Sequence, residues 1–506
     1  MFSTINTPDF IALYARSYPD KKALSDLMTN ESWTYARLDQ EICQVARLLK
    51  AKGCQAGDRV ALIARNNIQQ IILHFACARL AIIYVPFNWR LSVKELEFLM
   101  QSAEPKLLVC DAQSAETIEG VFPYEDLATF FSNALQCDPE TEFSFDDDRY
   151  SLMLFTSGTS GNPKGVMLSE RNLNQSGTNF SVLTAVDRNS CFLCEAPLFH
   201  VMGMVANVRT VLQHGGHIYL SDGYKADRTL AWLSDESMGI THYTGVPQMI
   251  ERLRTQDNFN PVPLRNITFI TGGAPHPFED IRAWLEDGVC LVSGFGMTEV
   301  GTALGMPLDR KLIDKKMGSV GLLAPGMKAR LVDNDGKDVA PGESGELWLK
   351  GDGITQGYWQ DEEKTQAVFS DGRWFMTGDI VTVDDEGYYW IIDRKKDMYI
   401  SGGENVYPAE IEAVALKHPD IEEVAVIGIP DKQWGEVGCL VVVTRGNENI
   451  SEEAIMQFLR DHLAAYKVPK HFEQVNELPR TKSTGKVQKQ ELKRKLLEEK
   501  FTAQAS

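Results

Sequence analysis

Apolar and polar positions follow two different patterns along this chain. Between residues 33 and 293, segments with apolar residues at helical spacing alternate with short, nearly continuous apolar runs. The helical segments are Tyr35–Lys50 and Lys94–Ser102, and the predicted buried strands are Arg59–Ile63, Lys106–Val109, Ser151–Phe155, Ile218–Leu220, Asn266–Ile270 and Val289–Ser293. Helices that alternate with buried strands predict an α/β fold with doubly wound sheets.

The second pattern covers residues 329–392. Here glycine-containing turns at 333–336 and 384–387 separate short alternating strands, of which Gly345–Lys350 and Tyr388–Ile392 are the clearest. Turns of this kind between alternating strands predict a small β-rich subdomain.

A charged run at residues 393–397 precedes the last part of the chain. This part is predicted to be α+β, with helices at Pro408–His418 and Ser451–Leu463, a strand at Val424–Ile429, and a basic tail from Arg480 to Lys500. Few apolar contacts cross a charged run, so a domain boundary is expected there. The expected domains are residues 1–394 and 395–506.

Composition excludes some classes of function. The chain has 506 residues and a net charge of −19, so non-specific nucleic-acid binding is not expected. The longest apolar stretch, Ile71–Phe87, contains His74 and Arg79 and is shorter than the roughly 20 residues of a membrane-spanning helix. Contact with a membrane surface is left open. The first residues lack the basic and apolar regions of a secretory signal, which predicts a cytoplasmic protein.

The cysteines do not predict a disulfide framework. There are nine of them, an odd number spread from Cys43 to Cys439, so reduced and mostly buried thiols are expected. Cys191 and Cys194 lack the second pair that a zinc site needs, and strand packing is the better interpretation. His214 and His217 form a weak metal motif, for which a turn between strands is expected.

The strongest candidate for chemistry follows the strand Ser151–Phe155. This segment is rich in glycine and hydroxyl residues and ends in a lysine; its candidate ligand-binding residues are Thr156, Ser157, Gly158, Thr159, Ser160, Gly161 and Lys164. Glycines let backbone N–H groups approach an anion, and the lysine adds positive charge, so the loop is predicted to bind phosphate. Gly165 stands where a Walker A loop has Ser or Thr, which argues against a P-loop NTPase. The alternative is a flexible linker.

Two further predicted strands end in small-residue turns, at residues 271–275 and 294–299. Three such strand ends predict one shared crevice for a ligand. In the crevice Phe295 is expected to stack on a base, and Glu299 to hold the Mg²⁺ that accompanies a nucleotide.

Five segments, in this order and spacing, resemble the motifs of the adenylate-forming enzymes, which include acyl- and aryl-CoA synthetases, peptide-synthetase adenylation domains and firefly luciferase. They are residues 156–165, 294–299, 374–379, 393–397 and Gly485-Lys486. The resemblance spans nearly the whole chain. It implies a large N-terminal domain and a small, mobile C-terminal domain that turns about a hinge near Lys396.

The resemblance also implies an ATP site. The 156–164 loop would wrap the β- and γ-phosphates, Thr298 would contact the α-phosphate, Glu299 would bind magnesium, and Asp379 would accept the ribose hydroxyls with support from Arg394. Adenine would lie between residues 273–275 and Phe295, where the family usually has tyrosine. The remaining residues implied in the nucleotide site are Gly273, Ala274, Pro275, Gly296, Met297 and Ile391.

The implied reaction joins a carboxylate to MgATP as acyl-AMP with release of pyrophosphate, and then passes the acyl group to the thiol of coenzyme A. Lys486 would stabilise the charge that builds at the α-phosphate, although one extra residue before it makes Lys482 a rival. Gly402 and Gly403 would line the CoA tunnel.

The acyl pocket is implied beside the segment 197–203, with His200 as a gate or wall. Its other expected lining residues are Val201, Met202, Gly203, Met204, Val246, Gly294, Gly301, Thr302 and Ala303. This apolar lining, without an evident cation, predicts a fatty or aromatic monocarboxylate. Two alternatives stay open: a stand-alone enzyme that loads a carrier protein or an amine, and a non-catalytic nucleotide-binding module. A homodimer is also left open.

Overall fold

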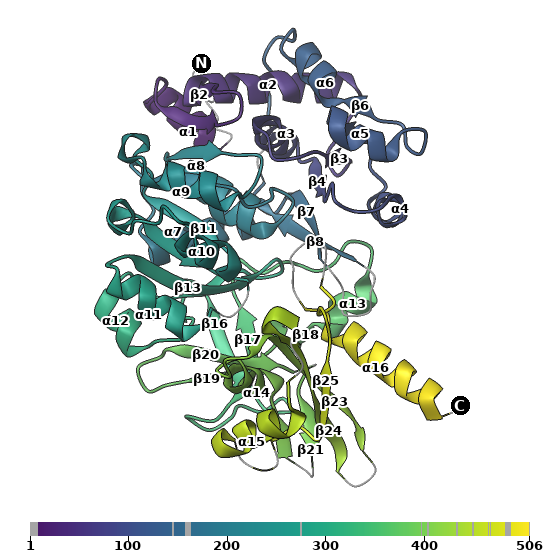
Figure 1. The fold of residues 1–506 in the computed structure, drawn as a ribbon. Coiled ribbons are helices and arrows are strands. Elements are labelled where there is room, and N and C mark those ends of the chain that lie inside the picture. Colours follow the sequence, from purple (N-terminus) through teal and green to yellow (C-terminus); the bar gives the residue numbers. More distant parts are fainter. Residues whose placement is uncertain are drawn as a thin grey trace. The chain divides into compact units, whose positions relative to one another are not determined.

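The computed structural model describes residues 9–143, 146–156, 163–273, 276–395, 397–401, 404–431, 434–447, 450–463, 465, 467–480 and 487–504. The chain divides into two compact units, whose elements are labelled in Figure 1. Unit 1 comprises Met1–Ala329, Leu349–Phe375 and Gly387–Tyr389, and unit 2 comprises Arg330–Trp348, Met376–Glu386 and Trp390–Ser506. The domain boundary expected after residue 394 stays a prediction.

A six-stranded sheet in unit 1 carries the strand before the predicted phosphate loop. Its order is β6 (Glu125–Asp126), β5 (Leu107–Cys110), β3 (Arg59–Ile63), β4 (Ile83–Phe87), β7 (Tyr150–Thr156) and β8 (Lys164–Ser169). All neighbours are parallel except β7 and β8, which form an antiparallel pair. Apolar residues of β3 and β4 pack against helix α4 (Val93–Ala103) in one buried cluster, which gives the sheet its core.

Unit 1 also contains a nine-stranded sheet with a parallel centre and antiparallel edges. Its order is β15 (Leu322–Leu323), β14 (Gly301–Gly305), β13 (Cys290–Met297), β12 (Thr268–Thr271), β11 (His242–Gly245), β9 (Cys191–Cys194), β10 (His217–Leu220), β1 (Lys22–Asp26) and β2 (Ser32–Thr34). The two sheets confirm the doubly wound α/β prediction.

The helices of unit 1 follow the strands in the expected alternation. They are α1 (Phe10–Ser17), α2 (Tyr35–Ala51), α3 (Ile68–Arg79), α5 (Ala112–Ile118), α6 (Leu127–Ala134), α7 (Glu170–Thr184), a π-helix η1 (Met202–Arg209), α8 (Thr210–Gln213), α9 (Ala226–Ser234), α10 (Pro247–Arg254), α11 (Phe278–Glu286), α12 (Arg310–Lys315), α13 (Glu362–Ala367) and the short 3₁₀ turns η2 (Glu236–Met238) and η3 (Pro263–Asn266). Ser169 and Asn172 form a capping box that starts α7 directly after β8.

A five-stranded sheet, in which β18 and β19 form an antiparallel pair, corresponds to the predicted β-rich subdomain. It consists of β16 (Lys328–Val332), β17 (Gly345–Lys350), β19 (Trp374–Val383), β18 (Phe369–Ser370) and β20 (Tyr389–Arg394), which pairs with β19. Strand β17 has the bounds that its alternating pattern predicts.

The last part of unit 2 is α+β, as expected. Its sheet contains β22 (Glu404–Val406), β21 (Tyr399–Ser401), β24 (Gly435–Thr444), β23 (Ile421–Asp431) and β25 (His471–Gln474). Helices α14 (Pro408–Ala415) and α15 (Glu452–His462) share one buried cluster with β23 and β24, and α16 (Lys489–Gln504) shares another. The 3₁₀ turn η4 (Arg445–Asn447) follows β24.

Several local predictions need correction. The strand expected at Asn266–Ile270 begins at Thr268, because Pro263 starts a 3₁₀ turn that occupies the preceding residues. The helix expected at Pro408–His418 ends at Ala415. His214 directly follows helix α8 and His217 begins strand β10, so this motif is a turn between a helix and a strand and not between two strands.

Other predictions are confirmed. Cys191–Cys194 is a buried strand, and none of the nine cysteines, all of them in the described residues, forms a disulfide. Across the described ranges, no helix is long and apolar enough to cross a membrane.

Candidate active site

The predicted phosphate loop joins two antiparallel strands. Thr156 at the end of β7 pairs with Lys164 at the start of β8, while Ser157, Gly158, Thr159, Ser160 and Gly161 lie outside the described residues. A Walker A loop instead leads from a strand into a helix. The hairpin therefore agrees with the sequence argument against a P-loop NTPase.

Lys164 and Glu299 meet at a residue that the sequence motifs did not single out. The Lys164 ammonium lies 4.8 Å from the centroid of the Tyr358 ring, and the Tyr358 hydroxyl donates to Glu299 Oε1 at 3.1 Å. Both Tyr358 and Glu299 are buried. The only sequence signal for Tyr358 is a glycine followed by two aromatic residues, which by itself predicts no function.

Backbone contacts hold the segment around Tyr358 against β8. Trp359 N–H donates to the carbonyl of Gly165 at 2.7 Å, and Met167 N–H donates to that of Gly357 at 3.2 Å. Thr355 N–H donates to the carbonyl of Glu299 at 2.8 Å. This segment thus joins the phosphate hairpin of one sheet to the end of β13 in the other.

The two further strand ends lie side by side, as predicted. Thr271 of β12 pairs with Ser293 of the parallel strand β13, so Gly273 and Phe295 follow at the same edge of the sheet. Phe295 is buried, whereas Gly296 is exposed. Ala274 and Pro275 lie outside the described residues. The three strand ends predicted to share a crevice belong to two sheets, connected through Tyr358.

The expected acyl-pocket residues approach this edge from the π-helix η1. A Cβ placed on Gly272 would lie 3.9 Å from Met202 Cε and 3.5 Å from the carbonyl oxygen of Gly294. Gly203 packs so closely on the carbonyl of Pro197 that a Cβ would come within 2.3 Å of it. The structure therefore brings Met202 and Gly294 together beside the crevice.

Polar contacts hold the surroundings of this pocket. The Asn207 amide donates to the carbonyl of Met202 at 2.8 Å, and Thr244 donates to Asn207 Oδ1 at 2.5 Å. Ser176 Oγ accepts from Thr302 N–H at 3.1 Å beside Gly301, whose φ is +64°. Of the other expected lining residues, Gly203, Met204 and Ala303 are buried, and His200, Val201, Val246 and Thr302 are half-buried.

A buried ion pair fixes the end of the π-helix. Arg209 donates to both carboxylate oxygens of Glu170, at 2.9 and 3.1 Å, and to Nε2 of His74 at 2.8 Å. Burial alone would raise the pKa of Glu170, but the charge and hydrogen bonds of Arg209 outweigh it and lower the pKa to about 2. Burial lowers the pKa of His74 to about 3, so His74 is neutral at pH 7.

In unit 2 the predicted ribose residues lie next to each other. Arg394 Nε lies 2.8 Å from Asp379 Oδ1; the Asp379 side chain is 3% exposed and that of Arg394 is 44% exposed. Ile391 is half-buried on the same strand as Arg394. Glu346 accepts from Lys395 Nζ at 3.0 Å and from Gly378 N–H at 3.2 Å, which ties the turn before Asp379 to the strand end at Arg394.

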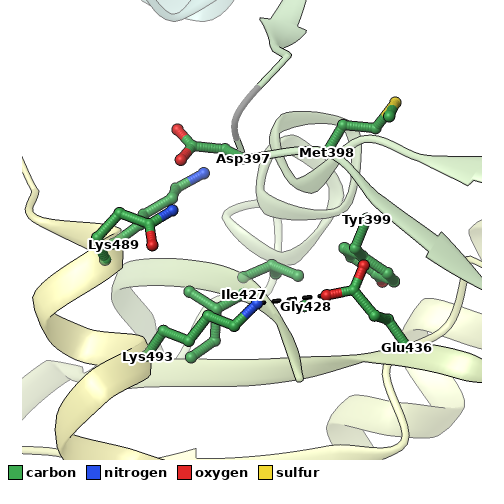
Figure 2. Close-up of a pocket in the computed structure, with 10 residues that line it drawn as sticks. Asp397, Met398, Tyr399, Ile427, Gly428, Glu436, Lys489 and Lys493 are labelled. Carbon is green, nitrogen blue, oxygen red and sulfur yellow. Dashed lines mark hydrogen bonds and ion pairs between the residues drawn. The ribbon is translucent and has the colours of Figure 1, made fainter. Parts of the chain in front are cut away.

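Lys486 and its rival Lys482 lie outside the described residues, as do Lys396, Gly402 and Gly403. The segment 481–486 is bounded by a β-bridge between Arg480 and Val487. An ion pair between Lys489 and Glu412 (2.7 Å) anchors the start of α16. Figure 2 shows the pocket beside this anchor, where Lys493 pairs with Glu436 at 3.3 Å.

Two family models cover most of the chain. Residues 12–359 match the model of the AMP-binding enzyme, and residues 410–486 match that of the AMP-binding enzyme C-terminal domain. The chain belongs to the AMP-binding enzyme family. This confirms the resemblance inferred from the five motifs.

Relatives of this AMP-binding enzyme are CoA ligases. It is 36% identical to a feruloyl-CoA synthase from an Amycolatopsis species, over 91% of this chain and 94% of the relative. The ATP-bound MatB from Rhodopseudomonas palustris superposes with a TM-score of 0.88 at 29% identity, covering 97% of this chain and 99% of that one. The o-succinylbenzoate CoA synthetase from Bacillus subtilis, in complex with its acyl-adenylate intermediate, gives a TM-score of 0.87 at 27% identity and covers 96% and 98%.

The residues of the AMP-binding enzyme fit magnesium held together with ATP. Glu299 is a buried carboxylate, an oxygen ligand of the kind that Mg²⁺ prefers, and a neutral hydroxyl orients it. No cluster of three or more His, Cys, Asp or Glu residues suited to a metal occurs within the described ranges. One carboxylate is enough when phosphates and water supply the other ligands, as is usual for magnesium.

Proposed function

We propose that this enzyme is an ATP-dependent carboxylate–CoA ligase that activates a fatty or aromatic monocarboxylic acid. The observation that carries the proposal is the convergence of Lys164 and Glu299 on Tyr358 in unit 1. That arrangement supports a site in which Lys164 binds phosphate and Glu299 binds magnesium. The Asp379–Arg394 pair supplies the matching group for a ribose. The named relatives support CoA as the acceptor.

In the first step a carboxylate oxygen of the acid attacks the α-phosphorus of ATP, and the bond from this phosphorus to the bridging oxygen breaks. Pyrophosphate leaves with that electron pair. Lys164 holds the β- and γ-phosphates, Thr298 contacts the α-phosphate, and Lys486 stabilises the charge that builds on it. Magnesium, when bound at Glu299, neutralises phosphate charge.

In the second step the CoA thiol loses its proton to solvent and attacks the acyl carbon, a carbon–sulfur bond forms, and AMP leaves as the carbon–oxygen bond breaks. We assign Gly402 and Gly403 to the thiol path and Lys396 to a hinge on which residues 395–506 turn between the steps. His200 acts as a wall of the acyl pocket in both steps. A cytoplasmic location stays a prediction, and a homodimer and contact with a membrane surface stay open.

Aromatic acids are the first substrates to test. The relatives reported above are named for feruloyl and o-succinylbenzoyl groups. Gly272, next to Met202, carries no side chain at the edge of the sheet, which suits a flat group. A pyrophosphate-release screen over aryl, fatty and dicarboxylic acids, with and without CoA, tests the proposal. We expect release with an aryl or fatty acid and acyl-CoA only when CoA is present. AMP release without acyl-CoA would instead favour an enzyme that loads a carrier protein or an amine.

The assignment of Lys486 is tested by separating the two steps. Lys486→Ala is expected to reduce carboxylate-dependent ATP–pyrophosphate exchange by about 100-fold or more, the size of effect that loss of one transition-state charge contact has elsewhere. Thioester formation from supplied acyl-AMP should change little. Lys482→Ala is the matched control, and a loss of exchange in this variant alone would transfer the role to Lys482.

A further inference from the structure

Tyr358 connects the two groups of the ATP site that carry opposite charges. Lys164 lies over its ring and Glu299 accepts from its hydroxyl. We propose that Tyr358 is a positioning residue for MgATP, whose hydroxyl orients the magnesium-binding carboxylate and whose ring holds the phosphate-binding lysine. This inference rests on the proposed function, because it takes MgATP as the ligand.

The hydroxyl can orient Glu299 without cancelling its charge. An ionised carboxylate only accepts hydrogen bonds, so the phenol must be the donor. An arginine or lysine in the same place would form an ion pair with Glu299 and compete with a cation for it. A phenol is a neutral donor. It fixes the carboxylate by its hydrogen bond at 3.1 Å and does not itself cancel the negative charge.

The ring of Tyr358 orients Lys164 without cancelling its charge. A ring face attracts an ammonium group through its quadrupole when the cation lies within about 6 Å of the centroid. The Lys164 Nζ lies at 4.8 Å. A direct ion pair between Lys164 and Glu299 would reduce the attraction of both groups for MgATP, because each would already be paired. Tyr358 keeps them in place while neutralising neither.

The backbone, not the side chain, sets the position of Tyr358. Its N–H donates to Thr365 Oγ1 at 2.9 Å, and the residue forms a β-bridge with Val166, two residues after Lys164. The neighbouring Trp359 N–H bonds to Gly165. These contacts do not involve the phenol. A substitution that removes the Tyr358 hydroxyl or its ring should therefore leave the backbone around residue 358 in place.

Two variants separate the hydroxyl from the ring. Tyr358→Phe removes only the hydroxyl, and Tyr358→Leu removes the ring as well. A matched control is Tyr388→Phe, since Lys316 Nζ lies 4.9 Å from the ring of Tyr388, which is also buried in unit 1. The readout is equilibrium binding of α,β-methylene-ATP, measured by calorimetry over a range of magnesium concentrations, together with binding of AMP without magnesium.

We expect Tyr358→Phe to raise the magnesium concentration for half-maximal analogue binding by about 3- to 10-fold, the net contribution typical of one hydrogen bond. AMP affinity should stay within about twofold, because AMP lacks the β- and γ-phosphates. Tyr358→Leu should in addition weaken the analogue without magnesium by about 3-fold. In a Glu299→Gln background, Tyr358→Phe should have no further effect on the magnesium dependence. Tyr388→Phe should bind like the wild type.

An unchanged magnesium dependence in Tyr358→Phe would overturn the inference. Equal losses of analogue and AMP affinity would overturn it too, since they would indicate a packing role. These results differ from failure of the proposed function, in which the wild-type enzyme itself would not bind the analogue with magnesium.

Discussion

Two arginine–carboxylate pairs with nearly the same contact distance, 2.9 and 2.8 Å, have opposite surroundings. In unit 1 the Arg209 side chain is fully buried against Glu170, and the two guanidinium nitrogens that bond Glu170 also donate to His74 and Asn174. In unit 2 the Arg394 side chain is 44% exposed, although its partner Asp379 is buried. The Arg209–Glu170 pair forms its hydrogen bonds inside the protein. In the second pair, the guanidinium of Arg394 is exposed and can be reached by a ligand. The same ion pair is structural in one place and suited to binding in the other.

The largest expected effect tests the buried pair. Arg209→Met leaves Glu170 as a buried charge without its cation, and loss of one partner of a buried pair typically costs about 3–5 kcal/mol. Chemical denaturation should show a loss of this size in the free energy of unfolding. The double variant Arg209→Met/Glu170→Met should recover most of it, because no isolated charge remains. A double variant no more stable than the single one would show that the pair is not the reason for the loss.

The pair also marks the limit of sequence analysis. Arg209 and Glu170 lie 39 positions apart and on no common motif, so nothing in the sequence connects them. Tyr358 and Glu299 were likewise unconnected until the fold placed them in contact. Lys164 and Glu299 could be proposed from the sequence, because each stands in a motif whose residue types have a chemical reason, and Asp379 could be proposed through the family resemblance; their roles stay predictions. Strand β3 was predicted with its bounds, because its apolar run is continuous.

Glu195 is a buried carboxyl group that, unlike Glu170, forms no ion pair with an arginine in the described residues. Glu195 accepts from the hydroxyls of Ser221, Thr229 and Tyr243, at 3.2, 2.7 and 3.1 Å. Burial outweighs these hydrogen bonds and raises the pKa of Glu195 to about 7 from its ordinary value of 4.5. Because the pKa in the folded state is the higher one, the stability that Glu195 contributes is fully present below pH 4.5 and is lost as the pH rises through 7.

Glu195→Gln should remove this pH dependence. At pH 8 the variant is expected to be more stable than the wild type by up to about 3 kcal/mol, the value of a pKa change of this size. At pH 4.5 the difference should largely vanish, since the wild-type carboxyl is then neutral as well. Urea denaturation of both proteins between pH 4.5 and 8 measures it. Parallel stability curves over this range would mean that folding does not raise the pKa of Glu195.

The half-exposed pair should respond in binding and not in stability. Asp379→Asn keeps the shape of the side chain but removes the charge that accepts from Arg394 and, as proposed, from the ribose. A hydrogen bond to a charged group is worth about 1.5–3 kcal/mol, so AMP affinity should fall by about 10- to 100-fold. Calorimetric titration with AMP measures this. A loss of unfolding free energy in Asp379→Asn as large as that in Arg209→Met would show that the Asp379–Arg394 pair is structural, like the Arg209–Glu170 pair.

The smallest expected effect comes from a pair with no buried member. Lys52 and Glu125 lie 2.6 Å apart, with 29% and 34% of their side chains exposed. Water and salt screen such a pair, and exposed pairs contribute about 0–1 kcal/mol. Lys52→Met should therefore change the free energy of unfolding by less than about 1 kcal/mol, and added salt should reduce even this difference. A loss close to that of Arg209→Met would show that contact distance decides the strength of these pairs. A small loss of unfolding free energy would support burial, and not contact distance, as what determines the strength of these pairs. Lys52 contacts its carboxylate at least as closely as Arg209 contacts Glu170.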